Sequence, residues 1–200
     1  MKAYEADMRH LIDKFIQADE ARPISAFGDL SLVEIIVDSG IAEAISSMPP
    51  GLQGNKQAIA ETIENNVRSK IIRDHLLDPA FFEEMSAVLN EIIKERRNNA
   101  ISYEAYLKKI ADLAARVQAG NSTSSPPSIV SPGQRALYHN LDCDEQLTIV
   151  LDRAVHSSRQ DGWRGNLPKE NLIKAELYKV LKDVEKVEAI FAIIRQHHEY

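Results

Sequence analysis

The chain has 200 residues, of which 44% are apolar and 27% charged, and its formal net charge is −6. This composition is that of an ordinary globular protein with enough apolar residues for a sizeable core. The acidic balance argues against an autonomous nucleic-acid-binding domain, which is normally basic.

The sequence also argues for a reducing, non-membrane environment. Cys143 is the single cysteine, so an internal disulfide and a CxxC-type metal site are excluded. No apolar run approaches the roughly 20 residues needed to span a bilayer, and the charged N-terminus does not resemble a signal peptide. We therefore expect a cytoplasmic protein without a membrane partner.

The first expected element is an amphipathic helix over residues 3–18, which ends at Arg22 and Pro23. Its polar side is mostly acidic or neutral. Met1 leads into this helix without an N-cap, so we expect the chain to begin partway through a longer protein. The apolar side consists of Tyr4, Met8, Leu11, Ile12, Phe15 and Ile16.

A short apolar segment, residues 30–37, follows Asp29 as its expected cap. A buried helix is favoured because no neighbouring segment offers a strand partner, although its β-prone residues leave a strand open. A small helix over 41–47 ends at the Pro-Pro-Gly sequence 49–51.

A longer helix is predicted from about 55 to 74, and it contains the unusual pair Asn65 and Asn66. Asparagine lowers helix stability by roughly half a kcal/mol relative to alanine, so the pair needs a reason. Bonds to a neighbouring helix are the favoured explanation, and contact with a partner macromolecule is the alternative.

Two capped helices then form the expected centre of the fold. Asp78 and Pro79 begin one helix, which extends to Arg97, and Ser102 begins the next, which extends to Val117. Their short connection predicts antiparallel neighbours with facing apolar stripes.

The stretch 119–132 is rich in small residues and proline, and it predicts a linker. We expect an N-terminal helical bundle over 1–118 and a smaller C-terminal helical part over 133–200, which can also pack as one unit. The C-terminal part contains a capping box at Ser131 and Gln134, a second helix start at Asp142 and Glu145, and helices near 172–181 and 184–194. The predicted fold class is therefore all-α, a multi-helix bundle built on an antiparallel helical hairpin.

No catalytic pattern is present. The sequence lacks a Gly-rich phosphate loop, GxSxG and HExxH, and its carboxylates are scattered over predicted helix faces. His197 and His198 should point to different sides of a helix. We therefore expect no catalytic residue, no cofactor-binding residue and no metal ligand.

Two groups of residues are candidates for contact with a partner or with DNA. Arg96 and Arg97 lie in a basic cluster with interleaved acids, which favours an ordinary solvated face over phosphate binding. Arg159, Trp163 and Arg164 lie on a Gly-rich loop, a composition that suits an interface. A lone tryptophan is more often part of a small core, and that interpretation is favoured.

The most specific blocks of the sequence are AETIENNVRSKII (60–72), DPAFFEEMSAVLNEIIKERR (78–97), ISYEAYLKKIADLA (101–114), ALYHNL followed by DE (136–145), and SRQDGWRGN (158–166) with a closing EY. In this order they resemble the C-terminal helical region of the restriction (R) subunit of type I restriction-modification enzymes. The resemblance covers nearly the whole chain.

The resemblance implies a non-catalytic domain that joins the motor subunit to the methyltransferase and specificity subunits. In that family, a nuclease domain and two ATP-driven motor domains lie upstream, so ATP and Mg²⁺ are expected there and no cofactor is expected in this chain. DNA is expected as a partner through the complex. Direct DNA contact by the four arginines and a self-associating helical scaffold are the alternatives.

Overall fold

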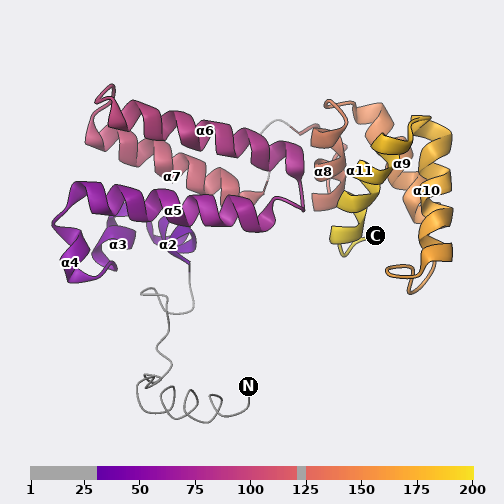
Figure 1. The fold of residues 1–200 in the computed structure, drawn as a ribbon, viewed down its shortest axis with the longest axis horizontal. Helices are drawn as coiled ribbons and strands as arrows, with labels where there is room; N and C mark the ends of the chain where they lie inside the picture. Colours follow the sequence, from indigo (N-terminus) through magenta and orange to yellow (C-terminus); the bar gives the residue numbers. More distant parts are fainter. Residues whose placement is uncertain (1–30, 121–124) are drawn as a thin grey trace, which may run out of the picture.

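The computed structural model describes residues 31–120 and 125–200. Within these ranges it contains ten α-helices and no β-strand, so the predicted all-α fold class is confirmed. The helices form two groups along the longest axis of the molecule (Figure 1). We call residues 31–120 the first lobe and residues 125–200 the second lobe. The predicted helix over 3–18 and the predicted cap Asp29 lie outside the described residues.

The first lobe is built on three long helices, with shorter helices packed against them (Figure 1). The apolar segment after Asp29 is a helix, as favoured. The elements are α2 (Leu32–Ser39), α3 (Ile41–Ser46), α4 (Pro50–Gln53), α5 (Lys56–Asp74), α6 (Pro79–Arg97) and α7 (Tyr103–Ala119). The connection between α6 and α7 spans only residues 98–102, so the chain reverses direction and the two helices lie side by side.

Side-chain caps explain where these helices begin. The Phe81 N–H donates to the Asp78 carboxylate (3.2 Å), and the Ala105 N–H donates to the Ser102 hydroxyl (3.2 Å), as predicted. The start of α2 is a capping box that was not predicted. There the Ser31 N–H donates to the Glu34 carboxylate (2.6 Å) and the Glu34 N–H donates to the Ser31 hydroxyl (3.3 Å).

The core of the first lobe lies between α2, α5, α6 and α7. The predicted stripes of α6 and α7 supply many of its buried side chains. Tyr106 is completely buried, and its hydroxyl donates to the Ala60 carbonyl (3.2 Å). The core includes Leu32, Val33, Ile36, Ile63, Val67, Ile71, Phe81, Phe82, Met85, Leu89, Ile110 and Leu113.

The second lobe has a core of its own, formed by α8 (Pro132–Asn140), α9 (Glu145–Ser158), α10 (Leu167–Leu181) and α11 (Val184–Gln196). The Ser/Pro stretch 119–132 separates the two cores in the sequence. The domain boundaries placed around it stay a prediction. The core includes Leu137, Leu151, Val155, Trp163, Ile173, Leu177, Ile190, Phe191, Ile194 and Tyr200.

Three local predictions are wrong. Asp144, not Asp142, caps α9, because Asp142 and Cys143 both adopt left-handed backbone angles (φ 55° and 60°) that close α8 and delay the next helix. The Asn66 amide donates to the Thr62 carbonyl of its own helix (2.9 Å) rather than to a neighbouring helix. His197 ends α11 as its C-cap, so it and His198 do not lie on opposite sides of a helix.

Candidate functional site

Arg96 is the first predicted contact residue, and it forms an ion pair inside the first lobe. Its guanidinium donates two hydrogen bonds to the Glu64 carboxylate, at 2.8 and 3.2 Å, and lies over the Tyr106 ring, 5.6 Å from its centre. The two charged side chains are 16% and 5% exposed. Burial opposes the charge of Arg96, but the hydrogen bond and charge of Glu64 outweigh it and raise the pKa of Arg96. The pair therefore belongs to the α5–α6 packing.

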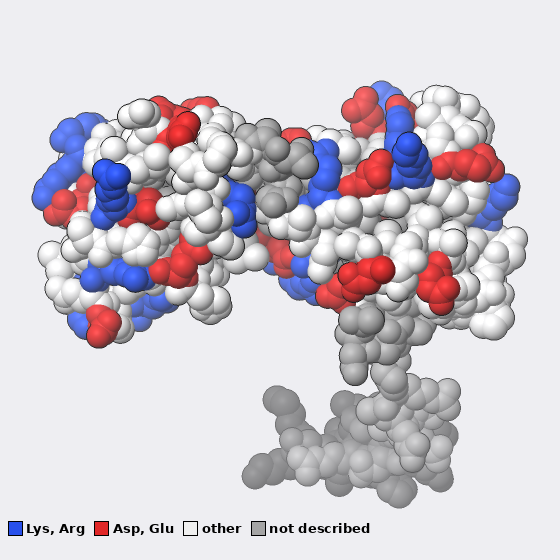
Figure 2. Space-filling view, turned by 180° about the vertical axis from the view of Figure 1, so that it is seen from behind, with Lys and Arg blue, Asp and Glu red and all other residues white. Residues whose placement is uncertain are grey.

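Arg97, in contrast, is exposed in the last turn of α6. Within the described residues it has no hydrogen bond or ion pair. Its basic neighbour Lys109 is paired with Glu95 (2.6 Å). Figure 2 shows lysines and arginines intermixed with aspartates and glutamates over both lobes. This mixture fits the solvated-face interpretation better than a continuous phosphate-binding surface.

The other three predicted residues lie on the α9–α10 loop, residues 159–166. Gly162 and Gly165 have φ angles of 64° and 77°, which few other residues adopt without strain. Trp163 is only 3% exposed and packs edge-on against Phe191, with ring centres 5.7 Å apart. Its indole N–H donates to the Tyr200 carbonyl (3.3 Å). The tryptophan is therefore part of the second core, which was the favoured interpretation.

Arg159 and Arg164 bind the C-terminal segment, residues 195–200. Arg159 donates to the Glu199 carbonyl (2.5 Å), and Arg164 donates to the Arg195 and His197 carbonyls (3.1 and 2.5 Å). The Arg164 guanidinium also lies over the Trp163 ring, 4.5 Å from its centre. The structure thus brings Arg159, Trp163 and Arg164 together, and all three hold one segment of the same chain.

The C-terminal segment is also held from its other side, by residues that sequence reasoning missed. The Ser131 hydroxyl (2.5 Å) and the Gly133 N–H (2.7 Å) both donate to the Glu199 carboxylate. The Tyr200 hydroxyl donates to the Asp152 carboxylate (2.9 Å). Burial, followed by the negative charge of Asp152, raises the pKa of Tyr200 strongly. The only feature of the sequence that pointed to a role for Glu199 and Tyr200 was the closing EY of the resemblance.

A buried polar junction connects the two lobes. Asp78 at the start of α6 accepts a hydrogen bond from the side-chain NH₂ of Asn140 in α8 (2.8 Å), and the Ala80 N–H donates to the side-chain oxygen Oδ1 of Asn140 (3.2 Å). The His139 ring nitrogen lies 2.5 Å from the second oxygen of Asp78. Asp78 was predicted as a cap alone, because nothing local marks its partners in α8.

The C-terminal segment adds a second contact between the lobes. The His197 imidazole lies 2.8 Å from the Leu77 carbonyl oxygen. A cavity of about 240 Å³ lies beside this contact and is lined by both lobes, including Leu77, Asp78, Phe82, Val117, Arg135 and His197. The C-terminal segment therefore contributes to the second core and also to the junction.

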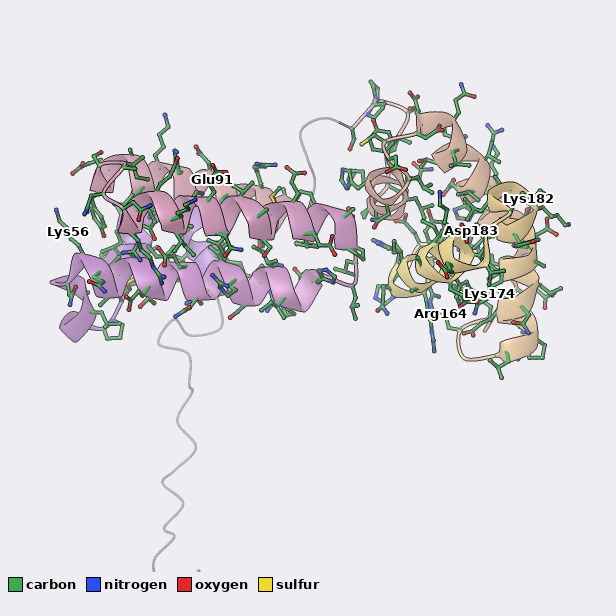
Figure 3. The ribbon with its side chains drawn as sticks, turned by 45° about the horizontal axis from the view of Figure 1, so that its top comes forward. Lys56, Glu91, Arg164, Lys174, Lys182 and Asp183 are labelled. Carbon is green, nitrogen blue, oxygen red and sulfur yellow. The ribbon has the colours of Figure 1, made fainter. Side chains whose placement is uncertain are left out.

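α10 has apolar side chains on two sides. Ile173 and Leu177 are buried in the second core, whereas Leu167, Leu172 and Tyr178 are 70%, 49% and 46% exposed. The helix forms the outer edge of the second lobe, on the side away from the first lobe, with Lys174 and Lys182 marking it in Figure 3. A surface helix normally keeps its outer side polar. This outer side is a candidate contact surface for another protein.

Among the residues that the structure describes, no three His, Cys, Asp or Glu side chains gather as they would around a metal ion. Over 31–120 and 125–200, no helix combines the length and apolar content needed to cross a membrane.

Comparisons with known proteins give no relative for this chain. No protein-family model, no curated protein and no solved structure matches it.

Proposed function

We propose that this chain is a non-catalytic docking domain. In a longer cytoplasmic protein it would join an ATP-driven DNA motor to a methyltransferase and specificity core, as the R-subunit resemblance implies. The motor and nuclease domains, with their ATP and Mg²⁺, would lie in that longer protein and not in this chain.

The observation that carries the proposal is the outer side of α10. Leu167, Leu172 and Tyr178 expose apolar surface on a helix that Ile173 and Leu177 anchor in the second core. Exposed apolar residues on a well-anchored helix are favourable for binding, because little side-chain or backbone freedom is lost on association. Tyrosine is one of the residue types that most often contribute strongly to binding at such surfaces.

The placement of the resembling blocks supports the same proposal. Blocks 60–72, 78–97 and 101–114 lie on α5, α6 and α7, and the block that begins at 136 supplies Asn140 to the junction. In the loop 158–166, Arg159 and Trp163 donate hydrogen bonds to the backbone carbonyls of Glu199 and Tyr200, which are the closing EY. The resembling blocks thus contain residues that form the cores of the two lobes and residues that connect the lobes.

The test is to mix the full 200-residue chain with the purified methyltransferase–specificity complex of a type I system. We expect co-elution at micromolar concentration and competition with the full-length R subunit. The double variant Leu167→Glu/Tyr178→Glu should weaken binding at least tenfold, because it places charge in an apolar contact.

A matched control is Val150→Glu/Val184→Glu, which changes two exposed valines of α9 and α11. This variant should bind as the unmodified chain does. Failure to co-elute together with failure to compete would count against docking, whereas equal loss in both variants would count against α10 as the contact surface.

A further inference from the structure

A groove between α6 and α7 opens on the surface of the first lobe. It has a volume of about 390 Å³, and every residue that lines it belongs to one of these two helices. α2, α5 and α8 pack most closely against α6 or α7 among the other described helices, and none of them contributes to the lining. Glu91, labelled in Figure 3, lies on the part of α6 that lines the groove. The described part of the chain therefore leaves this groove uncovered.

The floor of the groove is apolar. It is formed by Val88 and Ile92 of α6 and by Leu113 of α7. Ile92 and Leu113 belong to the first core, where they are 5% and 2% exposed, and the half-buried Val88 packs against that core. Because the core holds these side chains in place, a partner that packs on them would immobilise little that is not already fixed. The floor thus suits the apolar side of a partner.

Two ion pairs join α6 to α7 at the groove. Lys109 pairs with Glu95 (2.6 Å), and Arg116 pairs with Glu84 (3.0 Å). The pairs are eleven residues apart on α6 and seven residues apart on α7, which corresponds to about 16 and 10 Å along the two helix axes. A helix with its side chains is about 10–12 Å across. The space between the two pairs is therefore comparable with the width of one helix.

The walls of the groove between these ion pairs are acidic. Glu91 on α6 and Asp112 on α7 are exposed, and neither has a hydrogen bond or an ion pair among the described residues. Both bases of the lining already have a carboxylate partner, so the negative charge of these two acids is not compensated. One acid lies on each helix. Cationic groups at the two margins of a bound helix would complement them.

We propose that this groove binds a basic amphipathic helix of a partner protein. The apolar side of that helix packs on Val88, Ile92 and Leu113, and lysines or arginines at its two margins pair with Glu91 and Asp112. Insertion of an amphipathic helix into an apolar groove is a recurring mode of recognition. The groove belongs to the first lobe and the α10 surface to the second, so this inference does not depend on the proposed function.

The test uses a fluorescein-labelled peptide of leucine and lysine, about 18 residues long and patterned as an amphipathic helix. The peptide is titrated with the full 200-residue chain and followed by fluorescence anisotropy. We expect micromolar binding that weakens as the salt concentration is raised. A leucine–glutamate peptide lacks the positive charge, and a serine–lysine peptide lacks the apolar side. Each should bind at least tenfold more weakly than the leucine–lysine peptide.

Charge reversal locates the binding site. Glu91→Lys/Asp112→Lys should weaken binding of the leucine–lysine peptide at least tenfold and should strengthen binding of the leucine–glutamate peptide. Asp38→Lys/Glu43→Lys is the matched control, because it changes the net charge equally at two exposed acids of α2 and α3. It should leave both affinities within about threefold of the unmodified chain. Unchanged circular dichroism spectra would verify that both variants remain folded.

Three results would overturn the proposal. The first is absence of leucine–lysine peptide binding at low salt. The second is equal weakening by the two charge-reversal variants, which would mean that the peptide responds only to net charge. The third is equal binding of the serine–lysine peptide, which would mean that the apolar floor does not contribute. Leu167→Glu/Tyr178→Glu should bind the leucine–lysine peptide normally, so a failure of the groove is distinguishable from a failure of α10 docking.

Discussion

The His139 imidazole in α8 lies 2.5 Å from the carboxylate of Asp78, which caps α6 61 residues earlier. The same carboxylate accepts a hydrogen bond from Asn140. One buried acid therefore stabilises the start of a long helix in the first lobe and binds the second lobe. Because the two contacts use one side chain, loss of Asp78 should affect both helix α6 and the junction.

Asp78→Ala should lower the free energy of unfolding by about 2–4 kcal/mol. Loss of an N-cap costs about 1 kcal/mol, and removal of the buried acceptor for Asn140 and His139 costs roughly 1–3 kcal/mol more. Urea denaturation monitored by circular dichroism measures the change. Asp38→Ala, at an exposed acid near the end of α2, is the control and should change stability by no more than about 0.5 kcal/mol. Equal effects of the two substitutions would contradict the role of Asp78.

Gly133→Ala should displace the C-terminal segment. A Cβ at this position would lie 2.3 Å from the Glu199 carboxylate oxygen and 2.6 Å from the Tyr200 ring. The ring is buried and the carboxylate is held by two hydrogen bonds, so neither moves freely. We expect the free energy of unfolding to fall by about 1–3 kcal/mol, as for other overpacked sites. Trp163 fluorescence should shift to the red, because displacement of Tyr200 exposes the indole to solvent.

Gly51→Ala is the matched control for that substitution. No atom lies within 4 Å of a Cβ at Gly51, which is also helical, so alanine should be neutral or slightly stabilising there. A Gly133→Ala variant with unchanged fluorescence and stability would show that the C-terminal segment adapts without cost.

The helices could be predicted from the sequence because the signals are local. Apolar spacing and caps such as Asp78 and Ser102 lie within a few residues of the structure that they specify. The failure at Asp142 has a local cause too. Asp142 and Asp144 are both suitable N-cap residues. Asp144 is the cap because Asp142 and Cys143 adopt left-handed backbone angles, and neither residue type predicts that conformation.

The partners of the candidate contact residues could not be predicted from the sequence. Arg159, Trp163 and Arg164 were recognised as a group, but their partner is a segment 31 to 40 residues later in the chain. The buried Glu64 carboxylate is paired with Arg96, 32 residues away. Such pairings depend on tertiary packing, which residue spacing within one helix does not encode.

Arg96→Ala should be more destabilising than a surface substitution. It would leave the buried Glu64 carboxylate without its partner, and breaking a buried ion pair typically costs about 3–5 kcal/mol. Arg97→Ala, at the exposed neighbour, should cost less than about 0.5 kcal/mol. The double variant Glu64→Leu/Arg96→Leu should recover much of the loss, because no unpaired charge remains. Chemical denaturation of the three variants decides, and equal stability of Arg96→Ala and Arg97→Ala would contradict a structural role for Arg96.

Alkaline pH should destabilise the fold through Tyr106 and Tyr200. Burial raises the pKa of both hydroxyls above the usual value, with Glu64 and Asp152 as further causes. The unfolded chain therefore loses these protons at lower pH than the folded chain, so stability is fully present below about pH 10 and falls as pH rises above it. The decrease approaches about 1.4 kcal/mol per pH unit for each tyrosine.

Tyr106→Phe and Tyr200→Phe should each reduce the steepness of that decrease, and the double variant should reduce it by the sum, because the two residues lie in separate cores. Urea denaturation at several pH values from 8 to 12 measures the slope. Absorbance at 295 nm should show the two phenolates appearing only as the protein unfolds. A slope that neither substitution changes would mean that other groups control alkaline unfolding.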